Sequence, residues 1–120
     1  MDGAGNISVT APKNFTVNAG ENITMTAGKN VTVSAGDDMD NSAGKNITQT
    51  AGNDLSQSAM GNITEMSNNR TEMVEKDFIR QADTSNEIAS EVTIFSQKEN
   101  MTLQSGKTVE VNSAEKSKMF

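Results

Sequence analysis

Few residues of this chain could carry chemistry, and carboxylates are the main group among them. Asp37, Asp38 and Asp40 form the one dense carboxylate cluster. Such a cluster can hold a divalent cation weakly, but this one lacks the ligand spacing and the glycine of a calcium-binding loop. An exposed acidic corner is the favoured interpretation, and we expect no metal site and no cofactor.

Other catalytic and metal-binding side chains are missing from the sequence. The chain contains no Cys and no His, which excludes thiol chemistry, disulfides, histidine bases and the usual zinc sites. Its serines therefore lack the partner that a Ser-His-Asp triad needs. The solitary glycines form no phosphate-binding loop, and a formal net charge of -6 argues against nucleic acid as a partner. We expect a protein that is not an enzyme.

Asparagine-containing triplets are the other recurring chemical feature. Eight Asn-x-Ser/Thr triplets occur, among them those that begin at Asn6, Asn22 and Asn100. As glycosylation acceptors they would indicate a secreted glycoprotein. Most of them recur with a fixed spacing, so we interpret them as a by-product of a repeat. We expect neither a signal peptide nor a membrane-spanning segment.

The repeat has a period of eight residues and positions the side chains of the whole first half. Alanine recurs at positions 11, 19, 27, 35, 43, 51 and 59, and five of these alanines precede a glycine. Apolar and polar residues alternate within each unit, so that Ile23 and Met25 share one face of a strand and the threonines share the other. Each octad thus predicts a strand of about five residues. The Ala-Gly pair would end it, because glycine reaches backbone angles that other residues avoid.

One octad supplies only two inward side chains, so three octads are needed to enclose a core. Three octads of one chain would make the 24-residue turn of a β-solenoid, whereas three identical chains would each give one octad to every turn. In a solenoid the sequences of the three sides can diverge, which would produce a pattern with a period of 24 residues. The sequence shows little of such a pattern, so the trimer is favoured. A chain that is only 33% hydrophobic also gains from sharing a core. Disorder is the remaining alternative, but disordered chains rarely keep an apolar alternation in register.

Three segments follow from where the repeat holds and where it drifts. Residues 1–66 form a regular octad-repeat shaft, 67–91 an irregular and more charged continuation, and 92–120 the end of the β-helix and a C-terminal tip. In the middle segment Thr71, Met73 and Ile79 lie near the expected inward phase. Continued strands with larger corners are favoured there over a helical interruption.

Some inward positions of the shaft are polar, and the methionines fall near the strand face. The polar inward positions are Asn41, Gln49, Gln57 and Glu65. Their side chains would either form rings about a trimer axis or tilt outward, and the sequence does not decide between the two. Methionine packs irregular gaps well, so core filling is the favoured role of five of the eight methionines: Met25, Met39, Met66, Met73 and Met101.

The octads from Asn22 to Lys29, Asn30 to Asp37 and Asn46 to Asn53 resemble the triple-stranded β-helix of contractile injection machines. The likeness is greatest to the C-terminal needle of VgrG spike proteins of type VI secretion systems, and weaker to the needle of phage tail-spike lysozymes. It covers residues 6–66 strongly and 92–114 weakly. It implies an all-β fold, an intertwined homotrimeric triple-stranded β-helix.

The resemblance also implies a function. The chain would be a structural needle that pierces a target cell envelope, with a PAAR-type tip protein or an effector seated at its C-terminal end, nearest Lys118, Met119 and Phe120. Its tube-binding domains would lie upstream, since the start of the chain favours a fragment of a longer spike. Such a spike is cytoplasmic in the producing bacterium until it is assembled and injected. Without His, the chain cannot build the iron-tipped apex of some phage spikes.

Two other functions are considered. A trimeric fibre, adhesin stalk or effector-docking module would use the same shaft to display or bind another protein. A carbohydrate-active β-solenoid enzyme would present aromatic side chains and paired carboxylates in a groove. Four phenylalanines without any Tyr or Trp argue against that enzyme.

Overall fold

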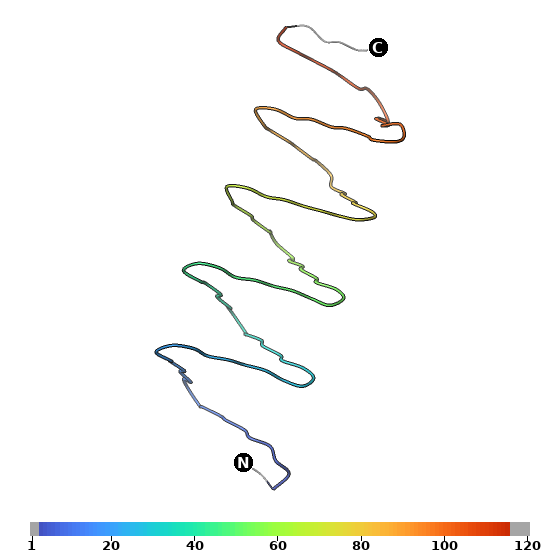
Figure 1. The fold of residues 1–120 in the computed structure, drawn as a ribbon. Helices are drawn as coiled ribbons and strands as arrows, with labels where there is room; N and C mark the ends of the chain where they lie inside the picture. Colours follow the sequence, from blue (N-terminus) through green and yellow to red (C-terminus); the bar gives the residue numbers. More distant parts are fainter. Residues whose placement is uncertain (1–2, 116–120) are drawn as a thin grey trace. The chain divides into compact units, whose positions relative to one another are not determined.

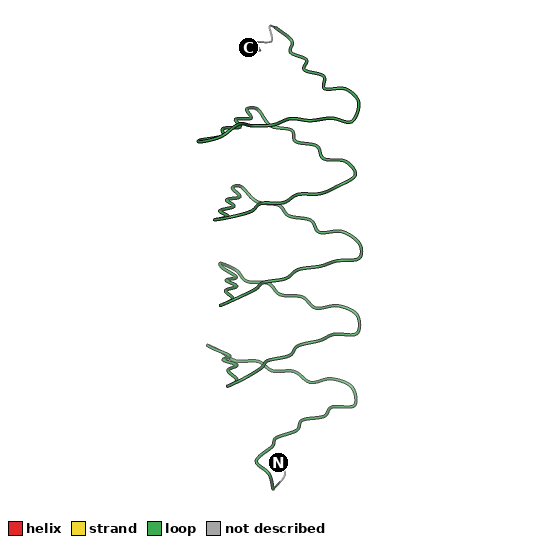
Figure 2. Ribbon diagram, turned by 90° about the vertical axis from the view of Figure 1, so that its right-hand side faces the viewer, coloured by secondary structure: helices red, strands yellow, loops and turns green. Residues whose placement is uncertain are grey.

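The computed structural model describes residues 3–115 and divides the chain into two units, Met1–Ile63 and Thr64–Phe120. Residues 3–115 contain no helix and no paired strand. Figures 1 and 2 show the chain of each unit as extended segments that change direction at regular intervals, and Figure 2 colours every described segment as loop. The strands expected from the octads are extended segments in this single chain, and their pairing with other chains stays a prediction.

The changes of direction follow the repeat. In the first unit the chain bends at the following pairs, each eight residues after the last: 12–13, 20–21, 28–29, 36–37, 44–45, 52–53 and 60–61. Five of these pairs begin with a glycine of the repeat, the first consists of Pro12 and Lys13, and the last consists of Met60 and Gly61. The eight-residue period of the sequence is therefore the period of the backbone path in this unit.

The same spacing continues in the second unit, where the sequence pattern is blurred. Bends lie at 68, 75–76, 83, 90, 97–99, 106–107 and 114–115, so successive bends are seven to nine residues apart. The segment 67–91 contains no helix, and its extended segments are as short as those of the shaft. The enlarged corners that we expected there are absent.

The path of the chain does not close on itself. Among the described residues, none lies within 8 Å, Cα to Cα, of another that is twelve or more positions away in the sequence. In a single-chain solenoid with a 24-residue turn, equivalent residues of successive turns would be about 4.8 Å apart. This structure therefore lacks the stacking that defines a single-chain solenoid.

Glycine has a different role at the bends from the one we expected. Gly5, with a φ of 86°, is the only described residue in the left-handed region. The glycines at the later bends have ordinary angles, and a Cβ added at any of them would meet nothing within 4 Å. Bends at 75–76, 83 and 90 contain no glycine at all. The expectation that the corners need the conformational freedom of glycine is wrong for this chain conformation.

Serine side chains hold the last bends of the second unit. The Ser96 hydroxyl donates to the carbonyl oxygen of Glu99 at 2.8 Å. The backbone N–H of Lys107 donates to the Ser105 hydroxyl at 3.2 Å, and that of Glu115 to Ser113 at 3.4 Å. Serine commonly accepts a bond from the backbone two residues ahead in this way. Here it stabilises the turn locally, without tertiary packing.

Candidate functional site

Apolar side chains that share one phase of the alternation, which we call the inner row, are the main surface feature of each of the two units. Its twenty members share one phase of the alternation, two per octad where the pattern is regular, and their exposed fractions run from 49% for Val109 to 76% for Leu103. They are Ile7, Val9, Phe15, Val17, Ile23, Met25, Val31, Val33, Met39, Ile47, Leu55, Ile63, Val74, Phe78, Val92, Ile94, Met101, Leu103, Val109 and Val111. No described side chain is buried.

The accessible surface of this chain is far larger than that of a globular protein of the same mass. The accessible area is 14243 Å². A globular protein of 12.8 kDa would expose about 6,300 Å², and the fully unfolded chain about 18,600 Å². The difference from the globular value, about 8,000 Å², exceeds the area buried in most obligate interfaces. Hydrophobic burial is the main favourable term in folding, and this conformation leaves the inner row without it.

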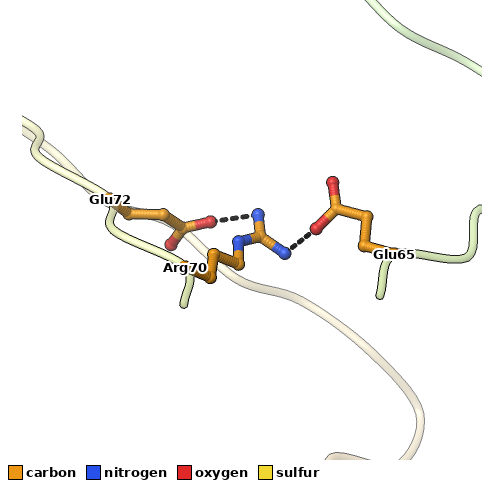
Figure 3. Close-up of polar contacts among 3 residues, drawn as sticks. All are labelled: Glu65, Arg70 and Glu72. Atoms are coloured by element: carbon orange, nitrogen blue, oxygen red, sulfur yellow. Dashed lines mark hydrogen bonds and ion pairs between the residues drawn. The ribbon is translucent and has the colours of Figure 1, made fainter. Parts of the chain in front are cut away.

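The second unit adds an ionic cluster to the inner row. Arg70 forms ion pairs with Glu65 and Glu72, one through each terminal nitrogen of its guanidinium group, as Figure 3 shows. The cluster spans the bend at 68, so it joins two successive extended segments. In the isolated chain the three side chains are 38% to 57% exposed, and such pairs are worth at most about 1 kcal/mol each.

A shallow concavity indicates which residues of the segment 67–91 share the phase of the inner row. It is lined by Glu72, Val74 and Phe78. The Arg80 guanidinium lies over the Phe78 ring, 5.6 Å from its centroid, in a cation–π arrangement. Our expectation placed Thr71, Met73 and Ile79 near the inward phase, and the structure shifts that phase by one residue. Met73 and Ile79 are 91% and 85% exposed, so they do not belong to the inner row.

The shift also changes the interpretation of the methionines. Met25, Met39 and Met101 lie in the inner row, in agreement with a packing role, although they are exposed in the single chain. Met66 and Met73 do not, because their exposed fractions exceed those of every inner-row residue. No described side chain is buried, so the core-filling role expected for these two methionines stays a prediction.

The remaining predicted residues fall into two groups. The tip residues Lys118, Met119 and Phe120 lie outside the described residues. Among residues 3–115 no three acidic side chains converge on a point where a metal ion would bind, so the structure does not gather Asp37, Asp38 and Asp40 into a site. Asp37 instead occupies the bend at 36–37. The pairing of Glu65 with Arg70 is not among the sequence-based predictions, although an Arg five residues after an inward Glu could have indicated an ion pair.

The apolar inner row is the main feature that residues 3–115 offer to a partner or ligand. Within residues 3–115 the chain forms no apolar helix of membrane-spanning length. Searches against protein-family models, characterised proteins and solved structures find no match to this chain. The repeat, the inner row and the open path of the chain are the features that bear on its function.

Proposed function

We propose that this chain is the shaft of a homotrimeric needle, in which three copies wind about a common axis with their inner rows together. The observation that carries the proposal is an open path combined with an uncovered apolar row. Three interleaved chains at a strand spacing of about 4.8 Å give each chain a pitch of about 14 Å, and successive turns of one chain then stay apart. That arrangement is compatible with the absence of close approaches between turns.

Backbone hydrogen bonding supports the same assembly. Within residues 3–115 the extended segments form no backbone ladder with one another, so their edges are available for pairing. Edges of this kind pair readily with other chains and cause aggregation unless they are covered. Interleaving three chains gives every segment a neighbour on each side and leaves edges only at the two ends of the shaft.

The role of the needle follows from the resemblance of its octads to those of VgrG spikes. We infer a non-enzymatic spike of a contractile injection machine that pierces an envelope and carries a tip protein or effector at its C-terminal end. Interwoven chains suit this task, because no chain can leave the assembly separately and resistance to unfolding becomes kinetic. The same trimer would serve a fibre or effector-docking stalk, which is the second candidate.

The mass of the chain in solution tests the assembly. Light scattering is expected to give about 38 kDa, three times the chain mass of 12.8 kDa, and the trimer is expected to survive unheated SDS. A monomer, or a trimer that dissociates at once in SDS, would refute the proposal of an interwoven trimeric needle.

A binding measurement separates the two roles. A purified PAAR-type cone protein is expected to bind the intact trimer and to bind at least about tenfold more weakly to a trimer lacking Lys118, Met119 and Phe120. Equal binding to both trimers would remove the tip role and favour the fibre.

A further inference from the structure

A second set of apolar side chains lies on the opposite phase from the inner row. In the unit Thr64–Phe120 its members are 80% to 98% exposed, above every inner-row residue: Met66, Met73, Ile79, Ile88 and Phe95. We call this set the outer belt. Three of its members are sequence neighbours of inner-row residues: Met73 of Val74, Ile79 of Phe78, and Phe95 of Ile94. Because adjacent side chains of an extended segment point to opposite sides, one core cannot take both sets.

The outer belt is confined to one stretch of the chain. In the shaft the residues between inner-row pairs are polar, such as Thr24, Thr32 and Thr48. Towards the C-terminal end they are polar again, as Thr102 and Glu110 show. The belt is therefore a local departure from a threonine-rich exterior.

The amount of apolar surface in the belt is large enough for a specific interface. Burying one such side chain removes about 60 to 120 Å² from water. If the proposed trimer forms, the fifteen side chains of three chains present about 900 to 1,800 Å² around the shaft. The largest apolar patch of an ordinary soluble protein is about 300 to 600 Å², and a stable complex buries about 800 Å² per partner.

Charges around the belt select the kind of partner. Asp77 and Glu91 share the phase of Ile79 and Phe95, and further carboxylates lie at the bends, at Glu75 and Asp83. Of the basic residues in the same stretch, Arg70 pairs with glutamates and Arg80 lies over Phe78, whereas Lys76 lies at a bend between two carboxylates. The belt is thus apolar with an acidic border, and a partner with Lys and Arg around an apolar surface complements it.

The same features disfavour a lipid bilayer. Acidic side chains are repelled by anionic membrane surfaces, which attract basic segments instead. Five successive segments stacked at about 4.8 Å place the first and last belt residues about 19 Å apart along the shaft. That length is well short of the hydrocarbon thickness of about 30 Å.

We propose that the outer belt is the docking site of a protein cargo that presents an apolar surface bordered by Lys and Arg. This inference rests on the proposed trimeric needle and assigns it a second attachment point, on the side of the shaft. The two methionines of the belt suit such a site, because the flexible thioether adapts to differently shaped partners.

The test uses the full chain and two synthetic amphipathic peptides of equal length, one built from Leu and Lys and the other from Leu and Glu. Fluorescence anisotropy measures their binding to the trimer. We expect the Leu/Lys peptide to bind at least about tenfold more tightly than the Leu/Glu peptide. The triple variant Met73→Thr, Ile79→Thr and Ile88→Thr should weaken Leu/Lys binding at least about tenfold. The matched control, Thr24→Ser, Thr32→Ser and Thr48→Ser, should leave it unchanged.

Light scattering on the same samples separates the two proposals. A monomer would overturn the needle and the belt together. A trimer that binds neither peptide, or whose triple variant binds as well as the parent, would overturn the belt alone. Assemblies larger than three chains that the triple variant abolishes would assign the belt to a second trimer. Co-sedimentation of the trimer with vesicles containing one third phosphatidylserine would assign the belt to lipid. Larger assemblies and co-sedimentation would each overturn the proposal of a protein cargo.

Discussion

Replacing Ile47 with alanine tests whether the inner row becomes a core. In the isolated chain Ile47 is 60% exposed, and truncating so exposed a side chain changes stability by no more than about 0.5 kcal/mol. In an interwoven trimer the same side chain is enclosed by two other chains. Its loss then costs about 2–5 kcal/mol per chain, or about 6–15 kcal/mol per trimer. The two states of the protein thus predict effects that differ by about an order of magnitude.

The lifetime of the trimer in SDS at a fixed temperature is the appropriate measurement, because assemblies of this kind unfold too slowly for equilibrium methods. If the lost contacts are already broken in the transition state, 6 kcal/mol shortens the lifetime by about four orders of magnitude. Thr48→Ala is the matched control, since Thr48 is the sequence neighbour on the opposite phase. Equal lifetimes of the two variants would refute the assignment of an inner and an outer face.

Three further predictions use the same lifetime measurement. Gly44→Ala is expected to stabilise the protein by about 0.4–1 kcal/mol per chain, because the glycine has an ordinary φ and open space at its Cβ; a destabilised variant would mean that a neighbouring chain passes close to this bend. Arg70→Met is expected to cost about 3–5 kcal/mol per chain, because two glutamates would be left unpaired inside the trimer. A cost below about 1 kcal/mol would show that the ionic cluster stays exposed. EDTA is expected to change nothing, since the carboxylates of the acidic cluster do not converge; a shortened lifetime would contradict that conclusion for Asp37, Asp38 and Asp40.

Much of the backbone path was predictable from the residue pattern. The eight-residue alternation predicted bends at fixed intervals, and the bends of the first unit recur with that interval. The inner row of the shaft was predictable for the same reason, because its octads have apolar residues on one phase and polar residues on the other. Glycine is not needed at the corners, because bends between extended segments do not require a left-handed residue, as the glycine-free bends at 83 and 90 show.

The middle segment was misassigned because its pattern is ambiguous. Val74 and Phe78 lie next to Met73 and Ile79, so apolar residues occupy both phases of the alternation. A shift of one residue exchanges the two faces of an extended segment, and an apolar neighbour on each side removes the information that sets the phase. The position of the bends, at 68 and 75–76, resolves the ambiguity in the structure and places Glu72 with Val74.

The repeat length, the apolar phase of the shaft and the exclusion of thiol and histidine chemistry all follow from residue types and spacing, because these are local properties of the chain. The ionic cluster of Arg70 and the outward position of the belt follow from the folded path. Both depend on where the chain bends between residues 64 and 95, and a bend that slips by one residue reverses the direction of every side chain in the segment after it.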